Sequence, residues 1–330
     1  FSLQVQKGEA YFNRSQNNVL EKVILFTGRG IIYDRNKKEL AWNKRETEET
    51  LVPTRTYLSP GFSHILGYVS YPTQDKSGKY WQGEFIGKDG LEKQYQDILH
   101  KSSGKIKIER DAMARVVSKE VISLPESGKN LVLYLDSELQ KKIIEEMEKS
   151  FETVGAKSGA AVAIDPRNGG VLALVSLPGF DNNIFNRGAD QKIINELLQD
   201  KNYSLFNRAI SGQYPIGSTI KPFEAIAALE EKIISPDKKI YDPGFIEIPH
   251  RYNPQIVYRF EGVTPHGWVD MRQALAVSSN IYLYTIGGGY KDQKGLGPTL
   301  IKKYLELFGL GKKTNIDLAN EAEGFIPSPA

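Results

Sequence analysis

The sequence predicts an α+β protein of two domains, an irregular N-terminal domain and a second domain with an antiparallel sheet and helices. At 330 residues the chain is longer than one ordinary domain. Over residues 1–120, short β-rich runs alternate with turn residues and charged segments. A strongly amphipathic segment and a hairpin pattern follow residue 130. We therefore expect domains at residues 1–130 and 131–330.

The first domain has β-rich runs at residues 23–27, 30–33 and 65–70. Residues 125–130, with a proline, a serine and a glycine, are typical of a linker. The runs are short and are separated by turn residues and charged segments, as in an irregular α+β domain.

The second domain opens with a predicted helix over residues 137–155. Ser137 and Gln140 have the spacing of a capping box, apolar residues recur at helical intervals, and Gly155 ends the pattern. Residues 159–165 and 171–176 predict a hairpin. A further helix is predicted over residues 218–233, where Pro222 is tolerated because it lies in the first turn.

Composition excludes several classes of function. The net charge of +3 is small, and no basic run is interleaved with aromatic residues, so nucleic-acid binding is not expected. The chain has no cysteine, which excludes disulfides and cysteine metal ligands. No segment approaches the roughly 18 consecutive apolar residues that a membrane helix requires.

A serine and a lysine three positions apart form the first candidate catalytic pair. Gly217 precedes Ser218, and an apolar helical pattern follows Lys221. If a helix begins at Ser218, the hydroxyl and the amine lie on one face within mutual reach. A serine hydroxyl is a poor nucleophile at neutral pH, and an amine that burial keeps uncharged can accept its proton. Because S-x-x-K also occurs by chance, this pair alone does not establish a site.

A second motif follows sixty residues later. Residues 276–280 contain S-x-N, formed by Ser278 and Asn280, in a predicted turn between helical segments. The hydroxyl of Ser278 can relay a proton, and the amide of Asn280 can bind both Lys221 and a substrate amide. S-x-N alone is most often an ordinary polar turn. The two motifs in this order are far more specific.

With both motifs the sequence resembles the penicillin-recognising serine acyltransferases, which share S-x-x-K, S-x-N and K-T-G. The flanking segments are similar to class B penicillin-binding proteins of the elongation type (penicillin-binding protein 2). The matching stretches of the transpeptidase domain are residues 131–136, 160–175, 178–185, 207–210 and 266–270. Those of the non-catalytic pedestal, a dimerisation-type domain, are residues 28–36, 65–69 and 86–95.

The resemblance implies a peptidoglycan D,D-transpeptidase that cross-links stem peptides during cell elongation. Ser218 would attack the carbonyl between the two terminal D-alanines of a stem peptide, with Lys221 as the base. Ser278 would relay protons and Asn280 would position the donor peptide. The acyl-enzyme would pass to the amine of a neighbouring stem, and β-lactams would acylate the same serine. No cofactor is implied.

The resemblance also implies partners and a location. A SEDS-type membrane glycosyltransferase and rod-shape scaffold proteins are expected to contact the pedestal. The protein is expected at the extracytoplasmic (periplasmic) face of a bacterial membrane, anchored by a helix ahead of Phe1.

Two departures from the family pattern concern the extent of the chain. The third motif, K-T-G, is absent, because Lys313-Thr314 is followed by Asn315. In relatives this motif lies on an edge strand that binds the substrate peptide and supplies one oxyanion N–H. We therefore expect the chain as given to be inactive, with an incomplete transpeptidase domain. The head segment of the pedestal is also short, at residues 40–54.

A loop-rich segment contains a candidate metal site formed by Asp242, His250, Glu261 and His266. Carboxylates and imidazoles suit zinc. By resemblance, some relatives hold a metal in this region with the help of a cysteine, which this chain lacks. Ordinary hydrogen bonding of the histidines is the alternative. We assign no metal and leave a site at Asp242, Glu261 and His266 open.

Two other functions use the same fold. A β-lactam sensor would be acylated at the same serine and deacylate slowly, but its usual form lacks the pedestal segments at residues 28–36 and 86–95. A non-catalytic activator of a cell-wall polymerase would not need Ser218, Lys221, Ser278 and Asn280 intact. The transpeptidase interpretation accounts for both sets of residues.

Overall fold

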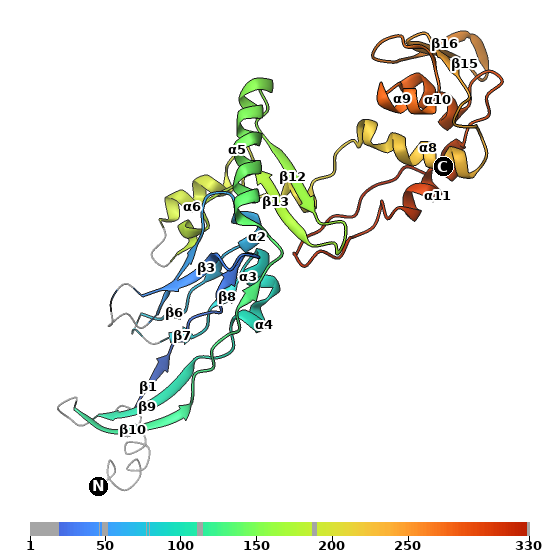
Figure 1. Ribbon diagram of the computed structural model, residues 1–330. Coiled ribbons are helices and arrows are strands. Elements are labelled where there is room, and N and C mark those ends of the chain that lie inside the picture. The colour runs from blue at the N-terminus through green and yellow to red at the C-terminus, as the bar shows by residue number, and fades with distance from the viewer. Residues whose placement is uncertain are drawn as a thin grey trace. The chain divides into compact units, whose positions relative to one another are not determined.

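The structure is a computed structural model that describes residues 20–45, 47, 52–76, 78, 80–110, 115–186 and 190–328. The chain divides into two compact units, which we describe separately. The first extends to Gly212 and includes Asp317–Glu321, and the second contains Gln213–Ile316 and the residues from Ala322 onward. Both contain helices and strands, which confirms the predicted α+β class (Figure 1). The predicted domain boundary near residue 130 lies inside the first unit and stays a prediction.

The N-terminal part of the first unit contains several small sheets. An antiparallel sheet has the order β1-β9-β10, and a second sheet has the order β11-β2-β3-β4, in which β11 pairs parallel to β2. The strands of the first sheet are β1 (Leu20–Leu25), β9 (Gly104–Arg110) and β10 (Val116–Ser123). Those of the second are β2 (Ile32–Tyr33), β3 (Glu39–Lys44), β4 (Thr54–Tyr57) and β11 (Leu131–Val132).

Shorter elements complete this region. Two strand pairs are β5 (Val69–Ser70) with β8 (Ile86–Gly87), and β6 (Thr73–Gln74) with β7 (Tyr80–Gln82). The helices are α2 (Ser63–Leu66), α3 (Gly90–Gln94) and α4 (Gln96–Leu99). The β-rich prediction for residues 65–70 was wrong over its first half, because Ile65 and Leu66 belong to α2. All four residues of α2 are buried, so tertiary packing overrides their local preference.

A buried carboxylate binds two arginines at the centre of this region. Oε2 of Glu92 accepts from Nε of Arg29 at 2.6 Å, and Oε1 accepts from Nε of Arg55 at 2.6 Å. All three side chains are fully buried. Arg29 follows β1, Arg55 lies in β4 and Glu92 in α3, so the pair of contacts joins three elements that are distant in sequence. A buried charge of this kind requires its partners to remain in place.

Helix α5 (Ser137–Val154) and the hairpin of β12 (Gly159–Ile164) and β13 (Val171–Leu177) form as predicted, and the helix packs on the hairpin (Figure 1). Gly155 ends the helix in the left-handed conformation. The predicted capping box was wrong, because Asp136 is the N-cap and accepts from the N–H groups of Glu138 and Leu139. Ser137 instead donates its hydroxyl to Oδ2 of Asp34 at 2.7 Å, and Gln140 donates to the carbonyls of Gly61 and Leu174. Both residues face inward and are fully buried.

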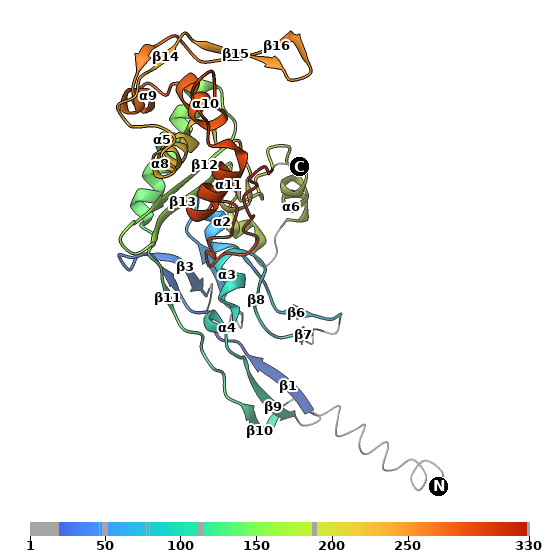
Figure 2. The same ribbon diagram turned by 90° about the vertical axis from the view of Figure 1, so that its right-hand side faces the viewer.

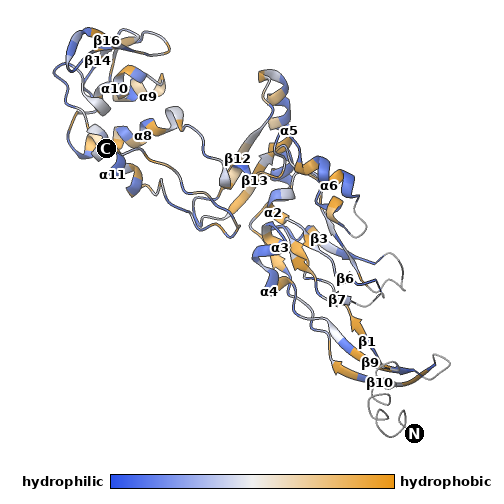
Figure 3. Cartoon of the chain, turned by 180° about the vertical axis from the view of Figure 1, so that it is seen from behind, coloured by the Kyte–Doolittle hydropathy of each residue, from blue (hydrophilic) through white to orange (hydrophobic). Residues whose placement is uncertain are grey.

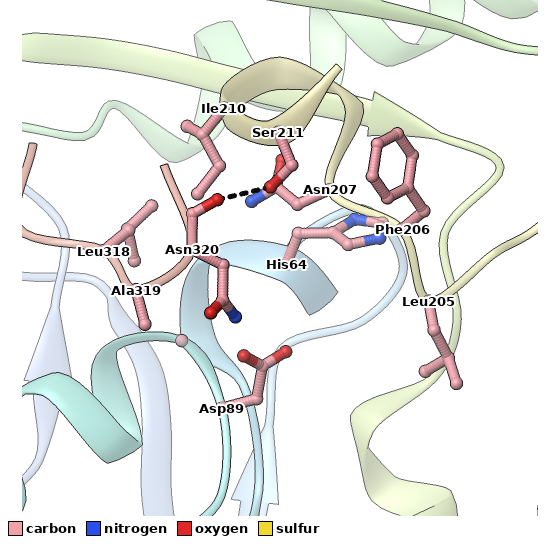
Figure 4. A pocket seen from close by; sticks show the side chains of 11 residues that line it. His64, Asp89, Leu205, Phe206, Asn207, Ile210, Ser211, Leu318, Ala319 and Asn320 are labelled. Atoms are coloured by element: carbon pink, nitrogen blue, oxygen red, sulfur yellow. Dashed lines mark hydrogen bonds between the residues drawn. The ribbon is translucent and has the colours of Figure 1, made fainter. Parts of the chain in front are cut away.

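The first unit continues with a 3-10 helix, η2 (Asn182–Phe185), and with helices α6 (Gln191–Leu198) and α7 (Arg208–Ser211). Residues 317–321 return to this unit. Figure 4 shows the hydroxyl of Ser211 donating to the carbonyl of Asn320, at 2.7 Å, beside a cavity of about 300 Å³. His64 and Asp89 also line this cavity. None of the predicted catalytic residues does.

The second unit is a group of helices with two small sheets. Its helices are the 3-10 helix η3 (Gly217–Ile220), α8 (Lys221–Glu230), α9 (Met271–Ala276), α10 (Asn280–Gly288) and α11 (Gly297–Leu307). Its strands are β14 (Ile240–Asp242), β15 (Phe245–His250), β16 (Asn253–Glu261) and β17 (Gly267–Val269). Strands β14 and β17 pair, and the hairpin of β15 and β16 extends away from α9 and α10 (Figure 2). Alanines of α8 pack against Tyr282, Leu283 and Ile286 of α10, which lets the two helices approach closely.

The edge strand β10 exposes hydrophobic residues, which are coloured orange in Figure 3. Val117, Val121 and Ile122 are each half exposed or more. Exposed apolar edges of this kind often mark contacts with other proteins. Among the helices that the structure describes, none is long and apolar enough to cross a membrane.

We predict that Glu92→Gln strongly destabilises the protein. The substitution leaves the buried guanidinium groups of Arg29 and Arg55 without their carboxylate, and breaking a buried ion pair typically costs about 3 to 5 kcal/mol. Urea unfolding of the two proteins measures the difference in the free energy of unfolding.

Glu138→Gln is the control for this prediction. Glu138 pairs with Lys38 at 2.5 Å, but both side chains are exposed, so loss of the pair is expected to leave stability nearly unchanged. Equal effects of the two substitutions would contradict the importance of the buried Glu92 contacts.

Candidate active site

Ser218 lies in the 3-10 turn that precedes α8, and Lys221 is the first residue of α8. The predicted helix start at Ser218 was therefore three residues early. Gly217 adopts φ of +59°, a conformation that favours glycine, and directs the chain into the turn. Pro222 lies in the first turn of α8, where its missing N–H is not needed. The side chain of Ser218 is exposed and accessible to a substrate.

The S-x-N motif occupies the turn between α9 and α10. Ser278 has φ of +55°, in the left-handed region that residues other than glycine seldom adopt. Ser279 caps α10 by accepting from the N–H of Tyr282 at 3.1 Å, and Asn280 is the first residue of that helix. The prediction of a turn between helical segments is confirmed.

A continuous set of hydrogen bonds joins the four predicted site residues. Nζ of Lys221 lies 2.6 Å from the backbone oxygen of Ser278, 2.9 Å from its Oγ and 2.6 Å from Oδ1 of Asn280. Oγ of Ser278 lies 3.0 Å from Oγ of Ser218. Lys221 and Ser218 are therefore connected through the hydroxyl of Ser278.

The chemical character of these partners defines what the amine of Lys221 can do. The backbone oxygen of Ser278 and Oδ1 of Asn280 can only accept hydrogen bonds, whereas the hydroxyl of Ser278 can donate or accept. A neutral amine has two N–H groups, which match the two pure acceptors, and its lone pair then faces the Ser278 hydroxyl. The site can therefore hold Lys221 as a base directed at Ser278.

Burial favours the neutral amine. Lys221 is 7% exposed, and burial lowers its pKa below the usual value for lysine. The carboxylate of Glu224 opposes this effect and raises the pKa of Lys221. A lowered pKa is what a base at this position requires, and burial acts on Lys221 in that direction.

Glu224 was not identified from the sequence. It lies one turn after Lys221 on α8, half-buried, with Oε1 facing Gly287 of α10. Burial raises its pKa to about 7, while Lys221 lowers it. Its neighbours Ala225, Ala227 and Ala228 are buried and apolar. A carboxylate among such residues, at helical spacing from the lysine, was the signal in the sequence.

The candidate metal ligands are only partly brought together. Nδ1 of His266 lies 2.8 Å from Oδ2 of Asp242. Glu261 pairs with Arg259 at 3.2 Å, and Nδ1 of His250 accepts from the N–H of Asn253 at 3.2 Å. Among the described residues, no three histidine, aspartate or glutamate side chains are grouped so that they could hold a metal. Hydrogen bonding accounts for the contacts of both histidines.

Known proteins share this sequence pattern. Residues 159–330 match the penicillin binding protein transpeptidase domain, and residues 48–133 match the penicillin-binding protein dimerisation domain. The chain belongs to the penicillin-binding proteins that carry a transpeptidase domain. Within that family, several of the relatives that it matches are named MrdA and several of the solved structures are of PBP2.

Three of these proteins show how similar the chain is to known relatives. The peptidoglycan D,D-transpeptidase MrdA of Acinetobacter baumannii is 36% identical over 274 residues, which are 81% of this chain and 38% of that relative. PBP2 of Pseudomonas aeruginosa, in complex with WCK 5153, is 31% identical with a TM-score of 0.67, and the match covers 91% of this chain and 59% of that one. PBP2 of Helicobacter pylori, in complex with MreC, is 25% identical with a TM-score of 0.72, at coverages of 93% and 69%. The chain thus spans less than two thirds of the length of the first two proteins.

We predict that Glu224→Gln lowers the pKa of Lys221 further. The carboxylate of Glu224 stabilises the ammonium form of Lys221, so its removal lets the ammonium lose its proton at lower pH. NMR titration of lysine Cε resonances measures this midpoint, which is expected below that of the exposed lysines in the unsubstituted protein and lower still in the variant.

Glu230→Gln is the matched control, because Glu230 lies on the same helix and is exposed. It should leave the Lys221 midpoint unchanged. A midpoint that moves equally in both variants, or that rises in Glu224→Gln, would show that Glu224 does not control the lysine.

Proposed function

We propose that the complete protein is a serine-type peptidoglycan D,D-transpeptidase. One observation carries this proposal: the hydroxyl of Ser278 bridges Ser218 and Lys221, and the other two contacts of Lys221 are pure acceptors. This arrangement lets a neutral lysine withdraw a proton from the nucleophile through Ser278. Membership of the transpeptidase family and the likeness to MrdA support the substrate class.

Acylation would begin with Lys221 uncharged. The proton of Ser218 Oγ moves to Oγ of Ser278 while the proton of Ser278 moves to Nζ of Lys221, and Ser218 Oγ forms a bond to the carbonyl carbon of the penultimate D-alanine. The C–N bond to the terminal D-alanine then breaks. The leaving amine takes a proton back along the same path, which restores neutral Lys221 and leaves an ester on Ser218.

Transfer to the second stem peptide would reverse this sequence. The amine of the neighbouring stem attacks the ester carbonyl, and its proton passes through Ser278 to Lys221. The C–O bond to Ser218 breaks, and the serine recovers a proton. The amide of Asn280 binds Lys221 through its oxygen, and its NH₂ group would bind the donor peptide.

A β-lactam would react at the same serine by opening its ring amide, and the resulting ester is the basis of the test below. The oxyanion formed in either reaction would be stabilised in part by the N–H of Ser218. Loss of one donor of this kind typically lowers the rate by about 100- to 1,000-fold.

The partners and location follow from the same proposal. The Helicobacter pylori PBP2 structure is a complex with MreC. We infer that this protein also assembles with a rod-shape scaffold protein and a SEDS-type glycosyltransferase at the periplasmic face of the membrane. The exposed apolar residues of β10 offer a surface for such a contact.

We predict that a labelled penicillin acylates the complete protein at Ser218. Peptide mass spectrometry should place the adduct on Ser218, and Ser218→Ala should abolish labelling while the melting temperature is retained. Thr219→Ala, which removes the neighbouring exposed hydroxyl, is the control and should be labelled normally. An adduct on a peptide without Ser218 would refute the assignment.

We predict that Lys221→Arg slows acylation by about 100-fold or more, the usual contribution of a general base. A guanidinium can still donate hydrogen bonds, but it stays positively charged and cannot accept a proton. Stopped-flow measurement with a fluorescent penicillin gives the rate. A normal rate in Lys221→Arg would exclude Lys221 as the base.

A further inference from the structure

Asp242, at the end of β14, is a buried carboxylate that binds the turn of the S-x-N motif. It is 1% exposed. Its Oδ1 accepts from the N–H of Gly244 at 2.8 Å. Its Oδ2 accepts from the hydroxyl of Ser279 at 2.6 Å and from Nδ1 of His266 at 2.8 Å. Hydrogen bonds to a carboxylate are stronger than those between neutral groups, so this residue can fix its partners firmly.

Ser279 is the middle residue of the motif and lies between Ser278 and Asn280. It is fully buried, and its hydroxyl both donates to Asp242 and accepts from the N–H of Tyr282. Ser279 therefore has no access to a substrate. It connects the start of α10 to the sheet of β14 and β17.

The neighbouring residue, Ser278, has an unfavourable backbone conformation. Its φ of +55° costs energy for a residue with a Cβ atom, so surrounding contacts must maintain it. Lys221 binds the turn on one side through the backbone oxygen of Ser278. Asp242 binds it through the next residue, Ser279. Without the second contact, the turn could relax and move the Ser278 hydroxyl away from Ser218 and Lys221.

We propose that the Ser279–Asp242 hydrogen bond, supported by His266, is a positioning contact that holds the Ser278 hydroxyl between Ser218 and Lys221. This inference rests on the proposed acyl transfer at Ser218. It assigns a role in that reaction to a buried serine and aspartate that touch neither substrate nor reacting atoms.

The position of Ser278 matters because proton transfer depends on short, aligned contacts. Its Oγ lies 2.9 Å from Nζ of Lys221 and 3.0 Å from Oγ of Ser218. A displacement of about 1 Å in a reacting geometry can lower a rate by about 100-fold. A change that relaxes the turn is therefore expected to lower the acylation rate constant more than the affinity for penicillin.

The test compares Ser279→Ala with Ser137→Ala in the complete protein. Ser137 is also a fully buried serine that donates to a buried aspartate, Asp34, at 2.7 Å, but it lies in the first compact unit. Both variants lose the same kind of bond. Saturation kinetics with a fluorescent penicillin separate the dissociation constant of the initial complex from the acylation rate constant, and thermal melting reports stability.

Ser279→Ala is expected to lower the acylation rate constant by about 10- to 100-fold with little change in the dissociation constant. Ser137→Ala is expected to keep the rate constant. Ser279→Thr retains the hydroxyl and should restore most of the rate. Equal rate constants in Ser279→Ala and Ser137→Ala would overturn the proposal, and so would failure of Ser279→Thr to restore the rate.

Two further measurements test the proposal if Ser279→Ala does not fold or if penicillin does not acylate the protein. If Ser279→Ala does not fold, Asp242→Asn keeps the shape of the acceptor but removes its charge, and an unchanged acylation rate constant in that variant would overturn the proposal. If penicillin does not acylate the unsubstituted protein, the proposed function fails, and NMR titration of Lys221 still tests the contact. Loss of the Ser278 acceptors should lower the Lys221 midpoint in Ser279→Ala, and an unchanged midpoint would overturn the proposal.

Discussion

The left-handed turn at Ser278 is the constraint on which the candidate site depends. Its conformation is unfavourable by itself, so it persists only because neighbouring groups bind it. Lys221 binds the turn through the oxygen of Ser278 and through Asn280, while Asp242 binds Ser279. The same contacts that stabilise the turn also place the Ser278 hydroxyl next to Ser218. A change that destabilises the turn is therefore expected to change the geometry of the site as well.

Buried polar and charged groups organise both compact units. Glu92 joins Arg29 and Arg55 in the first unit, whereas Lys221 and Asp242 join helices and strands in the second. A polar or charged group removed from water must keep its hydrogen-bonding partners, and this requirement specifies one arrangement of the surrounding elements. Apolar packing, such as that of the α8 alanines on α10, brings the elements close but is less selective about their exact placement.

Local patterns in the sequence predicted much of the fold. The helix of α5, its end at Gly155 and the hairpin of β12 and β13 agree with the structure because periodicity and turn residues act over a few positions. The wrong predictions involve residues whose contacts are with groups distant in the sequence. Ser137 and Gln140 have capping-box spacing, but neither caps the helix. The side chain of Ser137 donates to Asp34, and that of Gln140 donates to the carbonyls of Gly61 and Leu174. Ile65 and Leu66 are buried as a short helix despite their preference for strands.

For the site, the sequence by itself identified the four candidate residues, because S-x-x-K and S-x-N each place two functional groups within a few positions of each other. It also contained the family pattern that residues 159–330 match. Only the tertiary structure decided that the hydroxyl of Ser278 lies between Ser218 and Lys221, that Glu224 lies half-buried beside the lysine, and that Ser279 binds Asp242. These contacts join residues up to sixty positions apart. Their geometry depends on burial and on how α8, α10 and β14 pack, which no local pattern specifies.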